Sequence, residues 1–235
     1  MKAVIVAAGM GSRLWGQNDQ IPKTLMPFNN KTILATILRN IAAAGVREFV
    51  IVVGYRKELI VEYLAENDHF GYQIDLIENP EWQRGNGISV LAAEPAVNGQ
   101  PFLLSMSDHL VSVSAIHQIV RHSSLKNLLL VDPRIDAVFD LDDATKVRVT
   151  GHRILDIGKE IQQYNGIDCG VFKLTPRFFE AMRERLKLQQ ESISAAIQGL
   201  IQKDDMEAVF MKRDDFWIDI DTPEAYHHAL QIFGK

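Results

Sequence analysis

The chain has 235 residues, of which 47% are hydrophobic and 23% charged; this composition is typical of a folded domain and excludes intrinsic disorder as its main state. Its longest uninterrupted apolar run, Ala3–Ala8, has six residues, whereas a transmembrane helix needs roughly 20. The net charge of −5, without a long basic run, argues against a nucleic-acid-binding surface of the usual basic kind.

Cysteine usage and the N-terminal segment indicate the compartment. The one cysteine, Cys169, excludes an intrachain disulfide and a cysteine-based zinc site, and it suits a reducing environment. The N-terminal segment reaches Gly9 too soon to form the apolar region of a secretory signal, which has roughly 7–15 residues. We therefore expect a cytoplasmic protein without a membrane span.

The first half of the chain alternates strand and helix patterns. Ala3–Ala8 and Phe49–Val53 are continuous apolar runs, typical of strands buried in a parallel sheet. Isoleucine and leucine recur at helical spacing from Ile33 to Ile41, and the helix they predict ends at Gly45. The further elements predicted here are a helix over Glu58–Asn67, a strand over Gln73–Glu78, a helix over Ser89–Glu94, a strand over Phe102–Met106 and a helix over Ala115–Ser124. This alternation predicts a parallel sheet with right-handed crossovers.

The second half begins with predicted strands and ends with helices. The strands are predicted over Asn127–Val131, Thr145–Val149, Arg153–Ile157, Ile167–Leu174, Ala208–Met211 and Phe216–Ile220. The helices are predicted over Pro176–Leu188, Ser192–Lys203 and Pro223–Phe233. We interpret this half as completing the same sheet and closing over its carboxyl edge. Because ligands of open α/β sheets bind outside the carboxyl ends of strands, a site is expected after Ala8, Glu78 and Met106.

A glycine-rich loop follows the first strand. Gly9 and Gly11 allow backbone N–H groups to approach a phosphate without interference from a Cβ atom. Leu14 stands where the dinucleotide-binding fingerprint has its third glycine, and the P-loop pattern is absent, so neither of these nucleotide-binding motifs is indicated. The loop carries Arg13 and leads to Lys23, two cations suited to a triphosphate; the alternative is a strand-to-helix turn with solvated charges.

With Ser12, and with Pro22 before Lys23, this loop resembles the signature of the nucleotidyltransferases that activate sugar phosphates and related phosphomonoesters. The resemblance implies one Rossmann-like, three-layer α/β/α domain over residues 1–235, with a mostly parallel mixed sheet of the GT-A-like kind. It implies a nucleotide-binding half of about residues 1–125, an acceptor-binding half of about residues 126–235, and the use of Mg²⁺. It also implies that Arg13 and Lys23 neutralise the triphosphate.

A second glycine-rich segment, Gly85–Ser89, follows the strand at Gln73–Glu78. Judged alone, it is a hairpin or a helix-entry turn. In the family this segment lies against the base and ribose, and the cytidylyltransferase branch has an Asn-Gly pair followed by a serine, as here. The nucleotide-binding residues that the resemblance implies are Ala7, Ala8, Gly9, Gly11, Ser12, Arg13, Lys23, Gly85, Asn86, Gly87 and Asp108.

Carboxylates at two places are candidates for metal binding. Asp108 follows the strand Phe102–Met106 and suits Mg²⁺, which needs only one or two protein carboxylates; the alternative is that Asp108 caps the next helix. His109 is given only a minor ligand role. Asp219 and Asp221 alternate along a strand and so face the same side. The family takes its second metal ligand from a W-x-D-x-G-T or an I-D-T-P segment. This sequence fits both patterns, the first with Asp219 as the ligand and the second with Asp221. Which aspartate binds the metal therefore stays open, with Asp221 preferred.

Lysines of the second half are candidates for the acceptor site. Spacing alone predicts that basic residues such as Lys146, on alternating strands, face solvent. The resemblance matches Lys159 to the lysine that binds the acceptor phosphate, and we assign Lys146 and Asp168 to the same site. Gly158–Glu160 departs from the Glu-Lys-Pro segment of the sugar-nucleotide enzymes and resembles the cytidylyltransferases acting on inositol-1-phosphate, where Ala-Thr-Lys and Ile-Gly-Lys also occur. The acidic segment from Asp132 to Asp143 is interpreted as a solvated loop.

The expected activity is transfer of a nucleotidyl group from CTP to inositol-1-phosphate, with release of pyrophosphate. The resemblance to this branch extends from Lys2 to about Glu224. Another acceptor (phosphocholine or a sugar-1-phosphate, with CTP, UTP or GTP) is the alternative. Two other classes of protein compete with this interpretation. One is a glycosyltransferase, which needs no triphosphate loop, and the other is a regulatory paralogue that only binds nucleotide. The protein is expected to be a monomer or a homodimer, and the expected catalytic residues are Arg13, Lys23, Asp108 and Lys159.

Overall fold

The computed structural model describes residues 1–11 and 21–233. Ser12 and Arg13 of the signature loop lie outside the described residues. The first strand, β1 (Ala3–Ala7), is buried along its whole length, as its continuous apolar run predicts. It pairs in parallel with β4 (Glu48–Val53) and with β6 (Phe102–Met106), and β5 (Gln73–Glu78) pairs in parallel with β4. The parallel sheet predicted for the first half is confirmed.

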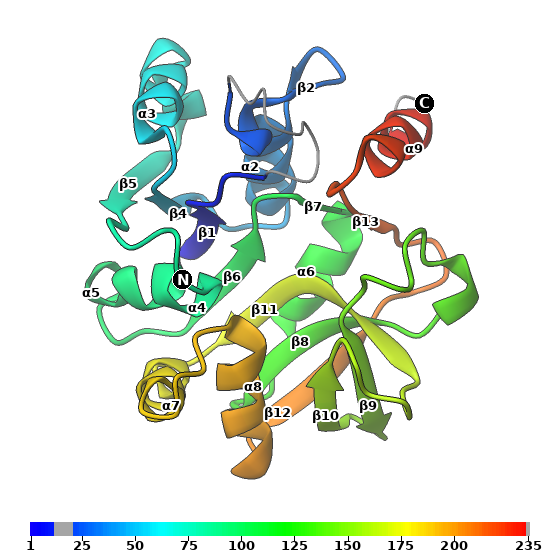
Figure 1. Cartoon of the computed structure of the whole chain (residues 1–235). Coiled ribbons are helices and arrows are strands. Elements are labelled where there is room, and N and C mark those ends of the chain that lie inside the picture. Colours follow the sequence, from blue (N-terminus) through cyan, green and yellow to red (C-terminus); the bar gives the residue numbers. More distant parts are fainter. Residues whose placement is uncertain (12–20, 234–235) are drawn as a thin grey trace.

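Strands of the second half extend the same sheet. Strand β11 (Gly166–Leu174) lies antiparallel between β6 and β8 (Asn127–Asp132), and β12 (Met206–Phe210) pairs in parallel with β8. Antiparallel pairings then add β10 (Arg153–Gly158) and β9 (Lys146–Thr150). Within the described residues, the sheet has nine strands in the order β5-β4-β1-β6-β11-β8-β12-β10-β9 (Figure 1). The strands β11 and β10 run against the other seven described strands, so the sheet is mixed, as predicted.

Helices cover both faces of the sheet, which makes the predicted three layers (Figure 1). Residues of β1 alternate between the faces: Ala3 and Ile5 pack in one core, and Val4 and Val6 in the other. The first core also contains residues of α2 (Ile33–Ala43), α3 (Lys57–Glu66), α6 (Val113–Arg121) and α9 (Pro223–Phe233). The second contains residues of α4 (Asn86–Ala92), α5 (Glu94–Val97), α7 (Arg177–Leu186) and α8 (Ile193–Gln202). The α/β/α fold class is therefore confirmed.

Short elements at the carboxyl edge of the sheet depart from the prediction. Residues expected in the loop after Asp108 form the strand β7 (His109–Val111), which pairs antiparallel with β13 (Trp217–Asp219) and sets Asp219 opposite His109. The hairpin of β2 (Pro27–Phe28) and β3 (Lys31–Thr32) and the 3-10 helices η1 (Lys23–Leu25), η2 (Asp68–Gly71) and η3 (Ile135–Ala137) complete the elements. The strand predicted over Phe216–Ile220 is therefore present as β13, whereas its partner β7 was not predicted, and the two together build part of the site.

The segment Gly85–Ser89 is a helix entry rather than a hairpin. The helix predicted to start at Ser89 begins at Asn86, with Gly85 at its N-cap, and ends at Ala92. Pro95 lies in the first turn of the following helix, α5, so the single helix predicted through Glu94 is wrong. None of the described helices is both long enough and apolar enough to cross a membrane. The division into nucleotide-binding and acceptor-binding halves, the cytoplasmic location, and the monomeric or homodimeric state stay predictions.

Candidate active site

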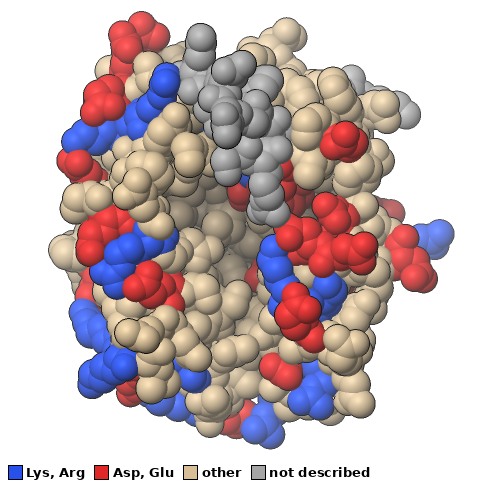
Figure 2. Space-filling model, viewed as in Figure 1, with Lys and Arg blue, Asp and Glu red and all other residues tan. Residues whose placement is uncertain are grey.

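Two cavities adjoin at the carboxyl ends of β1, β6 and β8. The larger has a volume of about 430 Å³ and the smaller about 170 Å³, and Asn86, Met106 and Asp108 line both. Figure 2 shows the surface hollowed at the centre of this face, with charged side chains around the hollow. The position agrees with the expectation that ligands bind outside the carboxyl ends of strands.

Lys23 lies buried among carboxylates between the cavities. Its side chain is 8% exposed, and its ammonium forms ion pairs with Asp221 and, at 2.8 Å, with Asp108. Burial alone would lower the pKa of Lys23, but the charges of Asp108, Asp221 and Asp219 raise it above its usual value. Lys23 is therefore a cation that neutralises part of a strongly acidic cluster.

Asp108 and Asp219 approach each other through His109. His109 Nδ1 lies 2.8 Å from Asp108 Oδ1 and 3.8 Å from Asp219 Oδ1. Burial opposes the charged ring, but Asp219 and Asp108 raise the pKa of His109 to about 9, so the imidazole is a cation at neutral pH and donates a hydrogen bond to Asp108. The Trp217 ring stacks on this imidazole, with centroids 5.9 Å apart. The two carboxylates thus share one oriented histidine.

The carboxylates of this cluster fit a divalent cation. Ligand atoms of Asp108, His109 and Asp219 all lie within 4.8 Å of one another. The Oδ1 atom of Asp219 is buried and has no hydrogen-bond partner among the described residues. Burial raises the pKa of Asp219, and the charges of Asp108 and Asp221 raise it further, although the charges of His109 and Lys23 oppose the shift. A hard cation with oxygen ligands would satisfy that atom.

The smaller cavity brings together much of the predicted nucleotide site. Of the predicted residues, Ala7, Gly9, Gly11, Lys23, Asn86 and Asp108 line it. Gly11 has φ +71°, and a Cβ there would lie 2.6 Å from Lys23 Cβ, so the glycine is required. Ala8, Gly85 and Gly87 are not among the lining residues; they support the site through backbone contacts, such as the hydrogen bond from Tyr55 N to Ala8 O. Ser89, the serine that follows the Asn-Gly pair, also lines this cavity, and lining residues that the sequence did not point to include Trp82 and Arg84.

The larger cavity holds two of the three predicted acceptor residues. Lys159 lines it, with Nζ 2.6 Å from Asp143 Oδ1. Asp168 also lines it and accepts a hydrogen bond of 2.8 Å from Gly170 N, while burial raises the pKa of its carboxyl to about 6. Lys146 is not among the described lining residues, and its Nζ donates to the backbone oxygen of Asp142 at 3.0 Å.

The interpretation of the acidic segment as a solvated loop is wrong for Asp132. This residue is 3% exposed and accepts a hydrogen bond of 2.9 Å from Trp217 Nε1. Arg134 also pairs with it, with Nε at 2.8 Å and Nη2 at 2.9 Å. All three residues line the larger cavity. The position of Asp132 at the carboxyl end of a buried strand was the signal that could have identified it.

The fold and the site together define a nucleotidyltransferase, and comparisons with known proteins agree. Residues 3–138 match the family described as the MobA-like NTP transferase domain, and the chain belongs to this family. It is similar in structure to the inositol-1-phosphate CTP transferase from T. maritima, with 28% identity and a TM-score of 0.86 over 98% of this chain and 95% of that one. The predicted family and enzyme class are therefore confirmed.

Two further similarities complete the comparison. The chain is 32% identical to a protein of Aquifex aeolicus named bifunctional IPC transferase and DIPP synthase, over 99% of this chain and 52% of that protein. It thus spans about half the length of the curated relatives it matches. A UDP-glucose pyrophosphorylase in complex with UDP-glucose, 19% identical with a TM-score of 0.84 over 99% of this chain and 98% of that one, has the same fold.

Proposed function

We propose that the chain transfers a cytidylyl group from CTP to inositol-1-phosphate and releases pyrophosphate. The observation that carries the proposal is the similarity, over nearly the whole chain, to a structure described as an inositol-1-phosphate CTP transferase. The relatives named IPC transferase and DIPP synthase also support it. Two cavities that adjoin at Asp108 suit a reaction in which two phosphorylated substrates must meet.

In this reaction an oxygen of the acceptor phosphate attacks the α-phosphorus of CTP. The bond from the α-phosphorus to the bridging oxygen breaks, and pyrophosphate leaves with the electron pair. A phosphomonoester has a second pKa near 6, so at pH 7 it is mostly a dianion and needs no strong general base. The main barrier is repulsion between anions, and positioned cations lower it by holding the reactants in line and by stabilising developing charge.

The cations of the site divide between the substrates. We assign Lys23, together with Arg13 outside the described residues, to the triphosphate and the leaving pyrophosphate. Because Lys23 already neutralises Asp108 and Asp221, the carboxylate cluster repels an incoming triphosphate less. We assign Lys159 to the acceptor phosphate and Asp168, as a hydrogen-bond acceptor, to hydroxyl groups of the acceptor. Lys146 remains a proposed acceptor-site residue on the strength of the family resemblance.

Mg²⁺ is the proposed cofactor, held by Asp108 and Asp219. Asp219 replaces Asp221, which the sequence favoured, because Asp219 contributes to the cluster with Asp108 and its buried Oδ1 atom has no hydrogen-bond partner among the described residues. When bound, Mg²⁺ would neutralise phosphate oxygens and orient the α-phosphate. His109 orients the Asp108 carboxylate through their hydrogen bond, so its role is to position a ligand.

A pyrophosphate-release assay tests the proposal. CTP, UTP, GTP and dTTP are each combined with inositol-1-phosphate, phosphocholine and glucose-1-phosphate in the presence of Mg²⁺. We expect the highest kcat/KM for CTP with inositol-1-phosphate. A clear preference for another nucleotide with a hexose-1-phosphate would overturn the substrate assignment while leaving the family unchanged. If none of the nucleotide and acceptor pairs releases pyrophosphate, the proposal that the chain catalyses this transfer is wrong.

A further inference from the structure

The turn that carries Asn86 is fastened to the start of helix α8. Glu191, two residues before the helix, accepts hydrogen bonds from Gly85 N through its carboxylate, at 3.2 Å, and from Gly87 N through its backbone oxygen, at 2.9 Å. Its carboxylate also pairs with Arg84 Nη2 at 2.5 Å. In return, Asn86 Oδ1 accepts a hydrogen bond of 2.9 Å from Ile193 N. We call these contacts, between residues 84–87 and 191–193, the clasp.

The glycines of the turn are needed for this close approach. A Cβ on Gly85 would lie 2.5 Å from Glu191 O, and a Cβ on Gly87 would lie 2.6 Å from the same atom. Gly85 has φ −60°, so its backbone angle alone would allow other residues. The Gly-Asn-Gly sequence is therefore needed for contact with the start of α8 as well as for the nucleotide site. The nucleotide site alone does not explain why both glycines are present.

The two sides of the clasp belong to different cavities. Arg84 and Asn86 line the smaller cavity, which is assigned to the nucleotide. Ile193 and Ser194, in the first turn of α8, line the larger cavity, which is assigned to the acceptor. Asn86 reaches both cavities. A ligand that orders either side of the clasp therefore also orders a wall of the other cavity.

The charged part of the clasp is open to solvent. The side chains of Arg84 and Glu191 are 41% and 30% exposed. Ion pairs in such positions contribute little to stability, so the clasp is not held closed as firmly as the buried core. When one ligand has already ordered a flexible contact, the second ligand bears less of the ordering cost, and the two bind with positive cooperativity.

We propose that Glu191 is a positioning residue that couples the two substrate sites by holding the Arg84–Gly87 turn against the start of α8. Bound nucleotide then strengthens acceptor binding, and bound acceptor strengthens nucleotide binding by the same factor. This inference rests on the proposed function, because the cavities are assigned to nucleotide and acceptor there. The inference adds that the affinity for each substrate depends on whether the other is bound, which neither cavity alone implies.

Calorimetry on the full chain tests the coupling. The Kd of inositol-1-phosphate is measured with Mg²⁺, in the absence and in the presence of saturating α,β-methylene-CTP, which cannot release pyrophosphate. The ratio of the two constants is the coupling factor, and we expect about tenfold for the unaltered chain, within the usual range of coupling between sites. If the release assay shows that another substrate pair is turned over, the same measurement is made with that acceptor and the corresponding nucleotide analogue.

The variants are Glu191→Ala, Glu191→Gln and a matched control. Glu191→Ala removes the carboxylate contacts with Arg84 and Gly85 N but keeps the backbone contact with Gly87 N, so it should lower the coupling factor several-fold. Glu191→Gln, which can still accept from Gly85 N, should give an intermediate value. The control is Glu184→Gln, which removes an exposed carboxylate paired with Lys203 at 2.8 Å on the same helix pair, outside both cavities. It should keep the factor of the unaltered chain.

The outcomes separate the inference from the proposed function. Turnover of the unaltered chain without cooperativity would overturn the inference and leave the function standing. The same holds if Glu191→Ala binds both ligands more weakly but keeps the coupling factor, since that is the result of a merely structural residue. Circular dichroism confirms that each variant is folded, and should Glu191→Ala fail to fold, the decision rests on the factor measured for Glu191→Gln.

Discussion

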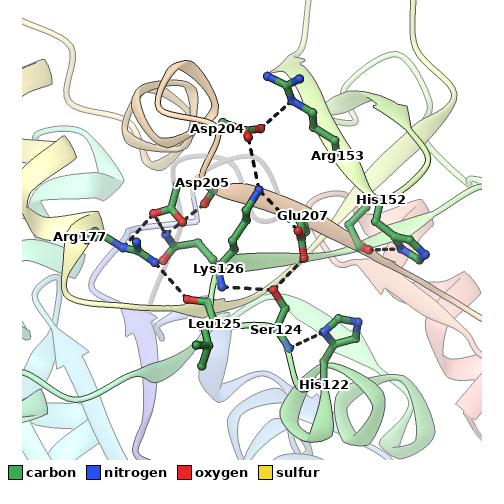
Figure 3. Close-up of polar contacts among 12 residues, drawn as sticks. His122, Ser124, Leu125, Lys126, His152, Arg153, Arg177, Asp204, Asp205 and Glu207 are labelled. Carbon is green, nitrogen blue, oxygen red and sulfur yellow. Dashed lines mark hydrogen bonds and ion pairs between the residues drawn. The ribbon is translucent and has the colours of Figure 1, made fainter.

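The two edges of the sheet, at the amino ends and at the carboxyl ends of its parallel strands, carry similar kinds of charged residue in different surroundings. At the amino end, Asp204 pairs with Arg153 at 2.7 Å and with Lys126 at 3.5 Å (Figure 3). These side chains are exposed, by 54% for Asp204 and 60% for Arg153. At the carboxyl end, Asp108 and Asp219 lie in a buried cluster with unequal numbers of positive and negative charges.

Figure 3 shows how completely the amino-end charges are matched. Asp205, which is largely buried, forms an ion pair with Arg177 Nε at 3.0 Å and accepts a hydrogen bond from Asn127 Nδ2 at 2.7 Å. Lys126 also approaches Glu207 at 3.7 Å. No described carboxylate of this group is left with an unsatisfied buried oxygen, whereas Asp219 at the other end is. Charged residues are thus present at both edges of the sheet, and the functional edge is marked by their burial and by an excess of carboxylates over cations.

The largest effect is expected at the buried end, from Asp108→Asn. This change keeps the shape of the side chain but removes a charge that we assign to Mg²⁺ and that pairs with Lys23. We expect kcat to fall by roughly 10²–10³-fold, the usual consequence of removing one electrostatic contact to a transition state. The measurement is pyrophosphate release across a range of Mg²⁺ concentrations, with circular dichroism as the check of folding. Near-normal turnover would mean that Asp108 is only a structural residue.

The next largest effect is expected from Lys159→Ala in the larger cavity. Its side chain is 47% exposed and its ammonium pairs with the partly exposed Asp143, so the ammonium can turn toward an acceptor phosphate. A hydrogen bond to a charged group contributes about 1.5–3 kcal/mol, so the acceptor KM should rise roughly 10–150-fold with less change in nucleotide affinity. A two-substrate kinetic matrix measures both. Weaker nucleotide binding with an unchanged acceptor KM would show that the acceptor site lies elsewhere.

Sequence patterns predicted the sheet better than the site. The buried strands and the helix faces follow from hydrophobic periodicity, which reports local burial directly. The helix predicted from Pro223 is present, and Thr222 caps it, with its Oγ1 accepting from Ala225 N at 3.1 Å. The glycine loop, Asp108 and the aspartates near residue 220 could be recognised because their spacing within one segment is fixed.

The remaining parts of the site depend on contacts between distant segments. Asp132 and Trp217 are 85 positions apart, yet their hydrogen bond forms part of the larger cavity. The contact of Glu191 with Gly85 joins positions 106 apart. Asp132 and Glu191 belong to no local motif, and the pairing of β7 with β13 was not predicted because each strand has only three residues. Such juxtapositions are properties of the folded chain and leave no periodic signal in the sequence.

A buried carboxylate near the site is expected to affect stability in a pH-dependent way. Asp215 is 4% exposed and also lines the larger cavity. Burial alone would raise its pKa, but hydrogen bonds lower the pKa below its ordinary value. The donors are Ser112 Oγ at 3.2 Å, Gln118 Nε2 at 2.7 Å, Lys212 N at 2.8 Å and the Ser114 hydroxyl.

Replacing this residue, as Asp215→Asn, should therefore destabilise the fold by about 1–3 kcal/mol at pH 7, because an amide cannot accept all of these bonds. A carboxyl with a lowered folded-state pKa stabilises the fold fully above its unfolded pKa, near 3.9, and the stabilisation is lost as pH falls through the folded-state value. The difference from the unaltered chain should thus shrink below about pH 4. Urea unfolding at pH 7 and at pH 3 measures it, and a constant difference would contradict the assigned ionisation.

The smallest effect is expected at the exposed end, from Arg153→Ala. The change removes the 2.7 Å ion pair with Asp204, but Lys126 still approaches Asp204 at 3.5 Å, so the carboxylate keeps a cationic neighbour. Exposed ion pairs are typically worth about 0–1 kcal/mol, because solvent screens the attraction and both long side chains lose freedom. We expect the free energy of unfolding to change by less than about 1 kcal/mol and both substrate KM values to stay the same. Urea unfolding and the release assay provide the measurements. A larger loss of stability, or a change in acceptor KM, would show that the matched charges at the amino end act on the site through β8 and β12, and the contrast between the two ends would fail.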